Sequence, residues 1–216
     1  MIGNFYDKII KNLPENVSIM GRDRFFNSVV LISIVNFNGV DHFLFQKRAK
    51  NIRQGGEICF PGGGFDPEKD KNAEETVIRE TMEELGINKD IIEIGGKFDS
   101  IVNSIGTFIE VFVGRLNIHD ISELHINHKE VEKILLVPVS YFKNNRPEEY
   151  KLRVEIHPTY INEEGEEITL FPAKELGVPP KYWKFWGGKS HTVYVYRTHG
   201  EVIWGITGQI IAELMK

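Results

Sequence analysis

The chain has 216 residues, of which 41% are hydrophobic and 26% charged, so it can bury a sizeable core and is not a disordered segment. Its net charge of -5 argues against a general nucleic-acid-binding surface, which needs a basic face. The one cysteine, Cys59, excludes an internal disulfide and a zinc site built from cysteines, and we expect it to be buried and inert. No segment resembles a signal peptide or a membrane span, so we expect a cytoplasmic protein that does not bind membranes.

The first part of the sequence predicts a short helix followed by a β-hairpin. Apolar residues recur at helical spacing over residues 5–13, and Pro14 ends that pattern. Residues 28–37 are rich in β-branched side chains and predict a buried strand. The turn signal Asn38-Gly39 joins it to a second strand at residues 41–49, which indicates a hairpin.

A glycine loop then leads into the second predicted helix. Residues 57–64, EICFPGGG, predict a short strand that runs into this loop. Residues 70–85 predict a helix, and Gly86 is a natural C-terminal cap for it. Glycines in such a loop allow the backbone to approach a ligand closely.

Strands dominate the second half of the chain. Strands are expected at residues 91–102, 106–116, 150–160 and 191–200, and residues 130–138 favour a strand over a helix. Loops are expected at 144–150 and 162–167. A short helix is expected at 139–142 and a closing helix at 202–216. The strands and helices do not alternate regularly, so we predict the α+β class.

Three glutamates crowd the helix that follows the glycine loop. Glu80, Glu83 and Glu84 are spaced to share one helical face. Carboxylate oxygens suit hard divalent cations such as Mg²⁺ or Mn²⁺. Arg79 lies four residues before Glu83 and is placed to orient it or to offset part of its charge. The alternative is a solvated acidic face without a ligand.

This helix resembles the second half of the Nudix box, G-x5-E-x7-R-E-U-x-E-E-x-G-U, where U is a bulky aliphatic residue. The matching residues are Arg79, Glu80, Glu83, Glu84, Gly86 and Ile87. Thr81 departs from the aliphatic position, and Lys71 stands where the box has a glutamate. Two extra residues separate Gly63 from Arg79, and Asp70 is the nearest acidic residue that could replace the missing glutamate.

The resemblance implies a Nudix fold, a mixed β-sheet between α-helices, in a single domain over residues 1–216 with a short N-terminal helix. It implies metal-dependent hydrolysis of a nucleoside diphosphate linked to another moiety. The metal, Mg²⁺ or Mn²⁺, would be bound by Glu80, Glu83 and Glu84, with Arg79 as their orienting partner. A general base for the attacking water is sought in Glu130 or Glu132, or within the box itself.

The preceding segment, FQKRAKNIRQGGEICFPGG, resembles the signature of the coenzyme A diphosphatase branch. The matching residues are Arg48, Ala49, Arg53, Gly56, Ile58, Phe60, Pro61, Gly62 and Gly63, with one residue too few between Arg53 and Gly56. The resemblance implies cleavage of coenzyme A to 3',5'-ADP and 4'-phosphopantetheine. It makes Arg48, Arg53, Gly62 and Gly63 the substrate-binding candidates. Lys47 and Lys50 complete a basic cluster that suits a phosphate, although a solvated strand end is the simpler reading.

Several alternatives stay open at this point. The substrate could be ADP-ribose or a nucleotide sugar, or the chain could be a non-catalytic nucleotide-binding Nudix module. His125 and His128 are weaker metal-ligand candidates. The aromatic cluster at residues 182–186, YWKFW, could stack an adenine, but packing in a core or an interface is the more common role of large aromatics. A homodimer is not excluded.

Overall fold

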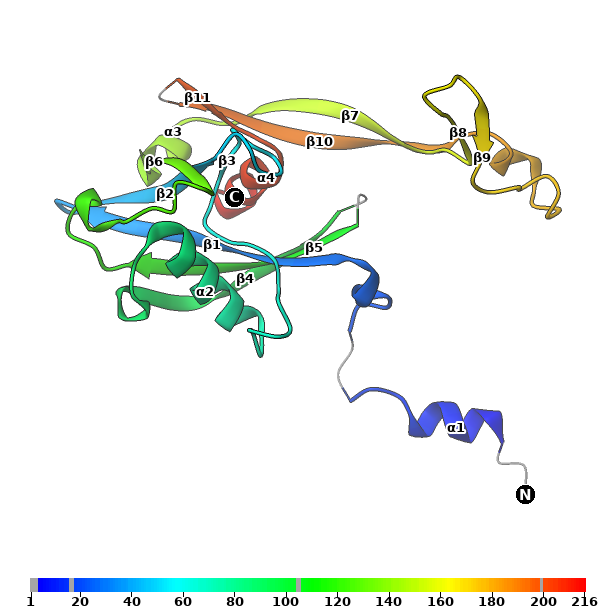
Figure 1. Cartoon of the computed structure of the whole chain (residues 1–216), viewed down its shortest axis with the longest axis horizontal. Helices are drawn as coiled ribbons and strands as arrows, with labels where there is room; N and C mark the ends of the chain where they lie inside the picture. Colours follow the sequence, from blue (N-terminus) through cyan, green and yellow to red (C-terminus); the bar gives the residue numbers. More distant parts are fainter. Residues whose placement is uncertain (1–3, 16–17, 104–105, 199) are drawn as a thin grey trace.

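A six-stranded mixed sheet forms the body of the computed structural model, which describes residues 4–15, 18–103, 106–198 and 200–216 (Figure 1). Its strands are β1 (Phe26–Phe37), β2 (Val40–Arg48), β3 (Ile58–Cys59), β4 (Ile92–Val102), β5 (Thr107–Leu116) and β6 (Val131–Pro138). The order is β3-β2-β1-β5-β4, and β6 also pairs with β2. β1 and β5 are parallel, whereas the other pairs are antiparallel.

Helices cover both faces of this sheet, because alternate residues of its central strands are apolar on both sides. Leu31 and Leu44 pack with Val77 of α2 (Ala73–Leu85) in one core cluster. Ile32 and Phe43 pack in a second cluster with Phe142 of α3 (Val139–Asn144). Helix α4 (Gly205–Leu214) joins the second cluster through Ile210 and Ile211. The predicted α+β fold, a mixed sheet between helices, is confirmed.

The predicted hairpin between β1 and β2 is also confirmed. Asn38 and Gly39 have φ angles of 52° and 79°, which are left-handed conformations that asparagine and glycine tolerate. The pairing register of Phe37 with Val40 closes a two-residue turn. This hairpin fixes β2, whose far end leads toward the glycine loop.

Residues 148–198 form a long β-ribbon, here called the arm, that extends away from the six-stranded sheet (Figure 1). Its strands are β7 (Glu148–Ile156), β8 (Thr159–Ile161), β9 (Glu167–Thr169) and β10 (Trp186–Thr198), and β11 (Glu201–Ile203) extends its base. β10 starts five residues earlier than predicted, residues 148–150 belong to a strand rather than a loop, and residues 202–203 belong to a strand rather than a helix. His199, within the predicted strand at 191–200, lies outside the described residues.

The N-terminal helix α1 (Phe5–Lys11) ends two residues before the predicted boundary and buries no side chain. Helix α2 begins at Ala73 rather than at residue 70, because Asn72 caps its first turn. Short 3₁₀ turns lie at Arg22–Arg24, Lys89–Ile91, Ile121–Glu123 and Pro180–Tyr182. Within the described residues, no helix has both the length and the apolar composition that a membrane crossing requires.

Candidate active site

The glycine loop lies between β1 and α2 and brings two carboxylates of the helix together. The backbone N–H of Gly62 donates to Oε2 of Glu84 at 2.9 Å. A side chain at Gly62 would meet the carbonyl oxygen of Val29 at 2.2 Å, and a Cβ on Gly63 would lie 2.3 Å from the carboxyl carbon of Glu80. Gly62 therefore lets the loop approach the backbone of β1, and Gly63 leaves room for the carboxylate of Glu80.

The ends of α2 fix the direction in which its carboxylates point. The side chain of Asn72 accepts a hydrogen bond from the backbone N–H of Glu75 at 2.9 Å and starts the helix. Gly86 ends it with a φ of 64°, and its N–H donates to the carbonyl of Met82 at 2.9 Å. The predicted role of Gly86 as a C-terminal cap is confirmed.

Arg79 is the centre of an ion-pair network along this helix. Its Nη1 donates to Oε1 of Glu80 at 2.9 Å and to Oε2 of Glu83 at 3.2 Å. Its Nε and Nη2 donate to the two oxygens of Asp70, each at 2.8 Å, and Nη2 also reaches the carbonyl of Gly64 at 3.2 Å. Arg79 thus connects two box glutamates to the glycine loop.

Asp70, in the loop before α2, pairs with Arg79 through both of its carboxylate oxygens. The loop before it is closed on itself, since the N–H of Asp70 donates to the carbonyl of Asp66 at 2.8 Å. The N–H of Asp66 in turn donates to Oδ2 of Asp70 at 3.0 Å. These two hydrogen bonds make the turn compact and hold the carboxylate of Asp70 against Arg79. The guanidinium of Arg79 lowers the pKa of Asp70 to about 2.

Burial raises the pKa of two glutamates at the loop. Glu84 is 4% exposed, and burial raises its pKa to about 8, although the N–H of Gly62 and the charge of Arg48 favour its ionised form. Burial also raises the pKa of Glu80, and the hydrogen bond from Arg79 opposes that shift. The charges of Glu83 and Glu130 raise the pKa of Glu80 further. These carboxylates are therefore crowded and short of positive charge.

Gln46 is a residue beside this site that the sequence reasoning missed. Its side chain is fully buried, and its amide lies close enough to Glu84 to favour the ionised carboxylate. No hydrogen bond of normal geometry to its amide is present within the described residues. The signal was a polar residue in the otherwise apolar run FLFQ of β2. Cys59, which pairs with Gln46 across the strands, is half-buried rather than fully buried, and burial raises the pKa of its thiol to about 11.

The oxygen donors at this site fit a divalent cation by their chemistry. Glu80 lies against Gly63 and Glu84 accepts a hydrogen bond from Gly62, so carboxylate oxygens of both glutamates lie at the glycine loop. Across the residues that the structure describes, no three His, Cys, Asp or Glu side chains are already arranged as a metal-binding group. The reason is visible in the hydrogen bonds, because Arg79 binds Glu80 and Glu83 while Glu84 binds the loop.

The members of the predicted basic cluster, Lys47, Arg48, Lys50 and Arg53, have different surroundings in the structure. Lys47 binds Glu201 at 3.0 Å, so its charge is offset by a carboxylate of β11. Arg48 is half-buried, and its charge lowers the pKa of both Glu57 and Glu84, which places its guanidinium next to the site. Its Nε donates to the carbonyl oxygen of Arg53 at 3.1 Å. Arg48 is therefore the member of the cluster that the fold brings to the carboxylates.

Arg53 and Lys50 are the exposed members of that cluster. The guanidinium of Arg53 lies 5.6 Å from the ring centroid of Phe26, a distance at which a cation and an aromatic face attract. Both side chains are open to solvent at the end of β2. They are accessible to a phosphate group, and neither is paired with a carboxylate in an ion pair among the described residues.

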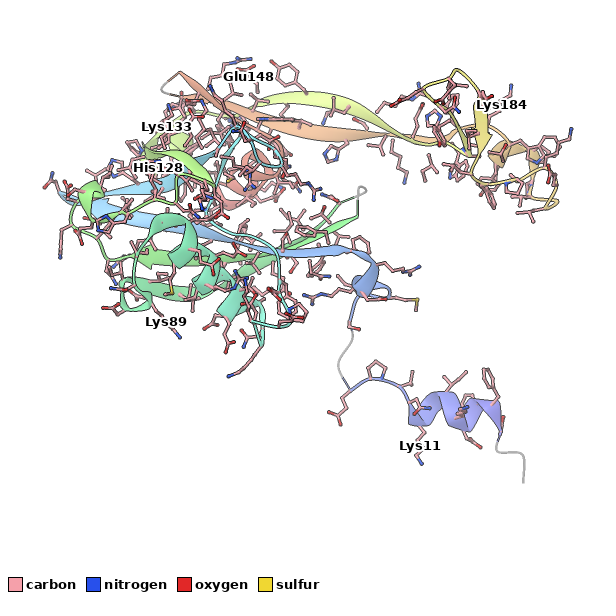
Figure 2. All side chains as sticks on the ribbon, viewed as in Figure 1. Lys11, Lys89, His128, Lys133, Glu148 and Lys184 are labelled. Carbon is pink, nitrogen blue, oxygen red and sulfur yellow. The ribbon has the colours of Figure 1, made fainter. Side chains whose placement is uncertain are left out.

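The two candidate bases, Glu130 and Glu132, face different charged groups. The charge of Glu130 raises the pKa of Glu80, so Glu130 lies near the box carboxylates. Glu132 instead faces Lys47 at 3.8 Å. The backbone N–H of His125 donates to the carbonyl of Leu85 at 2.9 Å, which anchors the loop before Glu130. His128 lies on the body (Figure 2).

The aromatic cluster at residues 182–186 lies in the arm rather than at the glycine loop. Tyr182 and Trp186 pack edge to face with centroids 5.5 Å apart, and Phe185 stacks on His157 at 5.6 Å. Lys184, in the middle of this cluster, lies at the far end of the arm, whereas His128 lies on the body (Figure 2). Within one molecule, the fold does not bring these aromatics to the candidate site.

A cleft of about 880 Å³ opens where the glycine loop meets the start of α2. Phe65 and Ala73 line it on one side, and Glu110 lies at its base with Lys97 and Arg22. Oε2 of Glu110 accepts from Lys97 at 2.5 Å, and Oε1 accepts from Arg22. The volume suits a nucleotide-sized group, and the cleft is adjacent to the loop that holds Glu80.

Comparisons with known proteins agree with this geometry. The NUDIX domain family matches residues 26–193 of the chain, which include every candidate site residue. Nudix hydrolase 3 of Caenorhabditis elegans is 36% identical over 113 residues, which cover 51% of this chain and 46% of that protein, so the match spans less than half of the relative. The Nudix hydrolase NudL of Photorhabdus laumondii is 30% identical over 174 residues, covering 80% of this chain and 75% of NudL. The crystal structure of the Nudix hydrolase RenU of M. smegmatis aligns with a TM-score of 0.44 and 18% identity, over 54% of this chain and 72% of that one.

Proposed function

The chain belongs to the Nudix hydrolase family, and we propose that it hydrolyses the diphosphate of coenzyme A or its derivatives to 3',5'-ADP and 4'-phosphopantetheine. The observation that carries the diphosphatase proposal is the convergence of Glu80 and Glu84 on Gly62 and Gly63. A loop without side chains beside two carboxylates suits a diphosphate bound through cations. We further propose that residues 1–216 form one domain, with the arm as an extension of it.

Nudix hydrolases generally use divalent metal ions, and we propose Mg²⁺ or Mn²⁺ for this chain. Glu80, Glu83 and Glu84 would hold the metal, because all three offer hard oxygen donors on one side of α2. When bound, the metal polarises phosphoryl oxygens and lowers the pKa of a coordinated water. Its positive charge would also favour the ionised forms of Glu80 and Glu84, whose pKa values are raised mainly by burial.

The remaining roles follow from the contacts of the chain itself. Arg79 orients Glu80 and Glu83, and Asp70 holds Arg79 in place on the loop side. Glu130 is the proposed general base, because its charge reaches Glu80 while Glu132 faces Lys47. Gly62 and Gly63 would let the diphosphate approach the loop backbone.

The proposal of coenzyme A as substrate is supported by the arginines after β2. Arg48 lies beside Glu84, and Arg53 is exposed next to it. Coenzyme A carries a 3'-phosphate in addition to its diphosphate, and arginine is well suited to phosphate groups. Arg48 would contact the diphosphate and Arg53 the 3'-phosphate.

The deciding experiment is product analysis by mass spectrometry. The purified protein would be incubated with Mg²⁺ or Mn²⁺ and, in parallel, with coenzyme A, ADP-ribose and a nucleotide sugar. We expect 4'-phosphopantetheine and 3',5'-ADP to form faster than any product of the other two. Cleavage of ADP-ribose or the nucleotide sugar alone would reject coenzyme A and retain a Nudix diphosphatase. Cleavage of none would favour a binding module or another substrate.

A further inference from the structure

Strand β7 of the arm has an apolar side that is open to solvent. Along β7, the side chains of Tyr150, Leu152, Val154 and Ile156 alternate with charged residues, so they share one face of the ribbon. Leu152 and Ile156 are each 53% exposed. An alternating strand normally buries its apolar side against another layer of the protein. The described part of this chain places no such layer over the outer half of the arm (Figure 1).

The edge of the arm is open as well. The sheet order is β11-β10-β7, so β7 has a paired strand on one side only. Two-stranded ribbons are marginally stable in water unless a third strand or a packing layer supports them. An exposed edge of this length is a template for pairing with another strand. Near the body, α4 supports β10, since a Cβ on Gly208 would lie 2.4 Å from the carbonyl oxygen of Tyr194.

The apolar area on the arm is large enough for a protein interface. Ten large apolar side chains of residues 148–198 are at least 38% exposed, and they include Tyr160, Leu170, Trp183 and Phe185 near the tip. Since an aromatic side chain can bury roughly 150–250 Å², half of that for the five aromatic ones alone gives on the order of 500 Å², to which the five aliphatic side chains add. One partner of a standard interface contributes about 800 Å². Monomeric proteins rarely expose a patch of this size.

The charge of the arm identifies the kind of partner. Residues 148–198 contain eight Asp or Glu and seven Lys or Arg, a net charge of -1. A surface with no basic excess does not attract nucleic acid or an anionic membrane. A partner that matches it must be apolar and must carry both signs of charge in alternation, as β7 itself does.

We propose that the arm is a dimerisation surface on which β7 pairs with β7 of a second copy of this chain. Antiparallel pairing about Val154 places Leu152 of one copy opposite Ile156 of the other, on the apolar face. On the charged face it places Arg153 opposite Glu155 of the other copy. Two-fold symmetry makes each of these contacts twice. Within one strand, Nε of Arg153 already binds Oε1 of Glu155 at 2.5 Å, so both charges lie on the same face.

Paired charge reversals test this pairing directly. The assembly state of the wild type, Arg153→Glu and Glu155→Arg would be measured by sedimentation equilibrium. We expect a wild-type dimer and at least a tenfold weaker dimer for each variant, because each places two like charges opposite each other. An equimolar mixture of the two variants should restore the dimer, since opposite charges then face each other across it. Mixing cannot restore the ion pair within either strand, so recovery reports contact between chains.

A second pair of variants tests the apolar face. Leu152→Lys combined with Ile156→Lys should abolish the dimer, while Val40→Lys, at a 47% exposed site on the body, should leave it intact. Circular dichroism would show that each variant is folded. At about 100 µM protein, a dimer with a Kd of about 1 µM would be almost fully formed. A wild-type protein that stays monomeric at this concentration would overturn the proposal. Failure of the mixed charge variants to associate, or survival of the dimer in the double lysine variant, would overturn the pairing through β7.

Discussion

Asp70 holds Arg79 through both carboxylate oxygens, with Nε–Oδ1 and Nη2–Oδ2 distances of 2.8 Å each. The aspartate side chain is 1% exposed and the arginine side chain 18%, so the pair is shielded from water. Arg79 in turn binds Glu80 and Glu83. An acidic residue in the loop before α2 thereby determines where two carboxylates of the helix point.

Replacing Asp70 by asparagine should destabilise the protein by roughly 2–3 kcal/mol, because it leaves the buried charge of Arg79 without its main partner. Urea unfolding would measure the change. Glu68→Gln, at an exposed position of the same loop, is the matched control and should change the free energy of unfolding by less than about 0.5 kcal/mol. Equal stability of the Asp70 variant and the control would show that the pair is not structural.

The pairing of Asp70 with Arg79 also predicts how the free energy of unfolding changes at acidic pH. The folded pKa of Asp70 is lowered from its ordinary value of 3.8 to about 2, so its stabilising effect is complete above pH 4 and is lost as the pH falls through that range. The stability difference between the wild type and Asp70→Asn should therefore shrink as the pH falls from about 6 to about 2. Urea unfolding at several pH values would measure it. A difference that stays constant would contradict the lowered pKa.

Much of the body of the fold could be predicted from local patterns. Three local signals each predict one element of it. The Asn38-Gly39 pair predicts the hairpin turn, the β-branched run predicts β1, and Gly86 predicts the end of α2. The face shared by Glu80, Glu83 and Glu84 follows from helical geometry alone. These features were accessible because their causes lie within a few residues of sequence.

Contacts between distant segments could not be predicted in this way. The sequence places Lys47 in a basic cluster that suits a phosphate, but in the fold its ammonium group pairs with Glu201, 154 residues away. Gln46 was not identified, because its proximity to Glu84 depends on how β2 packs beside α2. The extent of the arm was underestimated because its strands carry exposed apolar residues, and no intramolecular burial marks their limits.

Glu83→Gln should reduce turnover by about two orders of magnitude or more and leave stability nearly unchanged. The Glu83 side chain is 50% exposed, and its hydrogen bond is the 3.2 Å contact with Arg79, so little packing is lost. The variant removes one proposed metal ligand. Steady-state kinetics and thermal unfolding would be compared with Asp90→Asn, an exposed acidic residue just beyond the helix. Near-normal turnover would reject Glu83 as a ligand.

Arg53→Ala should weaken the binding of coenzyme A more than the binding of dephospho-coenzyme A. The KM for coenzyme A should rise by about tenfold relative to the KM for dephospho-coenzyme A, as expected for the loss of a charged hydrogen bond. The backbone carbonyl that accepts from Arg48 is retained in this variant, so the loop should keep its shape. Lys47→Ala is the control, because Lys47 is paired with Glu201 and should affect both substrates equally. An equal loss for both substrates in the Arg53 variant would rule out contact with the 3'-phosphate.

Glu130→Gln should lower kcat by about 10²- to 10⁴-fold, because the amide cannot accept the proton of the attacking water. The KM should stay near that of the wild type, because a base that acts on the attacking water does not contribute to ground-state binding of the substrate. The backbone of Glu130 is held by Ala49 and Asn127 at 2.8 and 2.9 Å, so the substitution should not move the loop. Glu132→Gln is the matched control two residues away, and its kcat should stay near that of the wild type because Glu132 faces Lys47. If Glu130→Gln retains the kcat of the wild type, the base must lie among the box glutamates, where burial already raises the pKa of Glu84 to about 8.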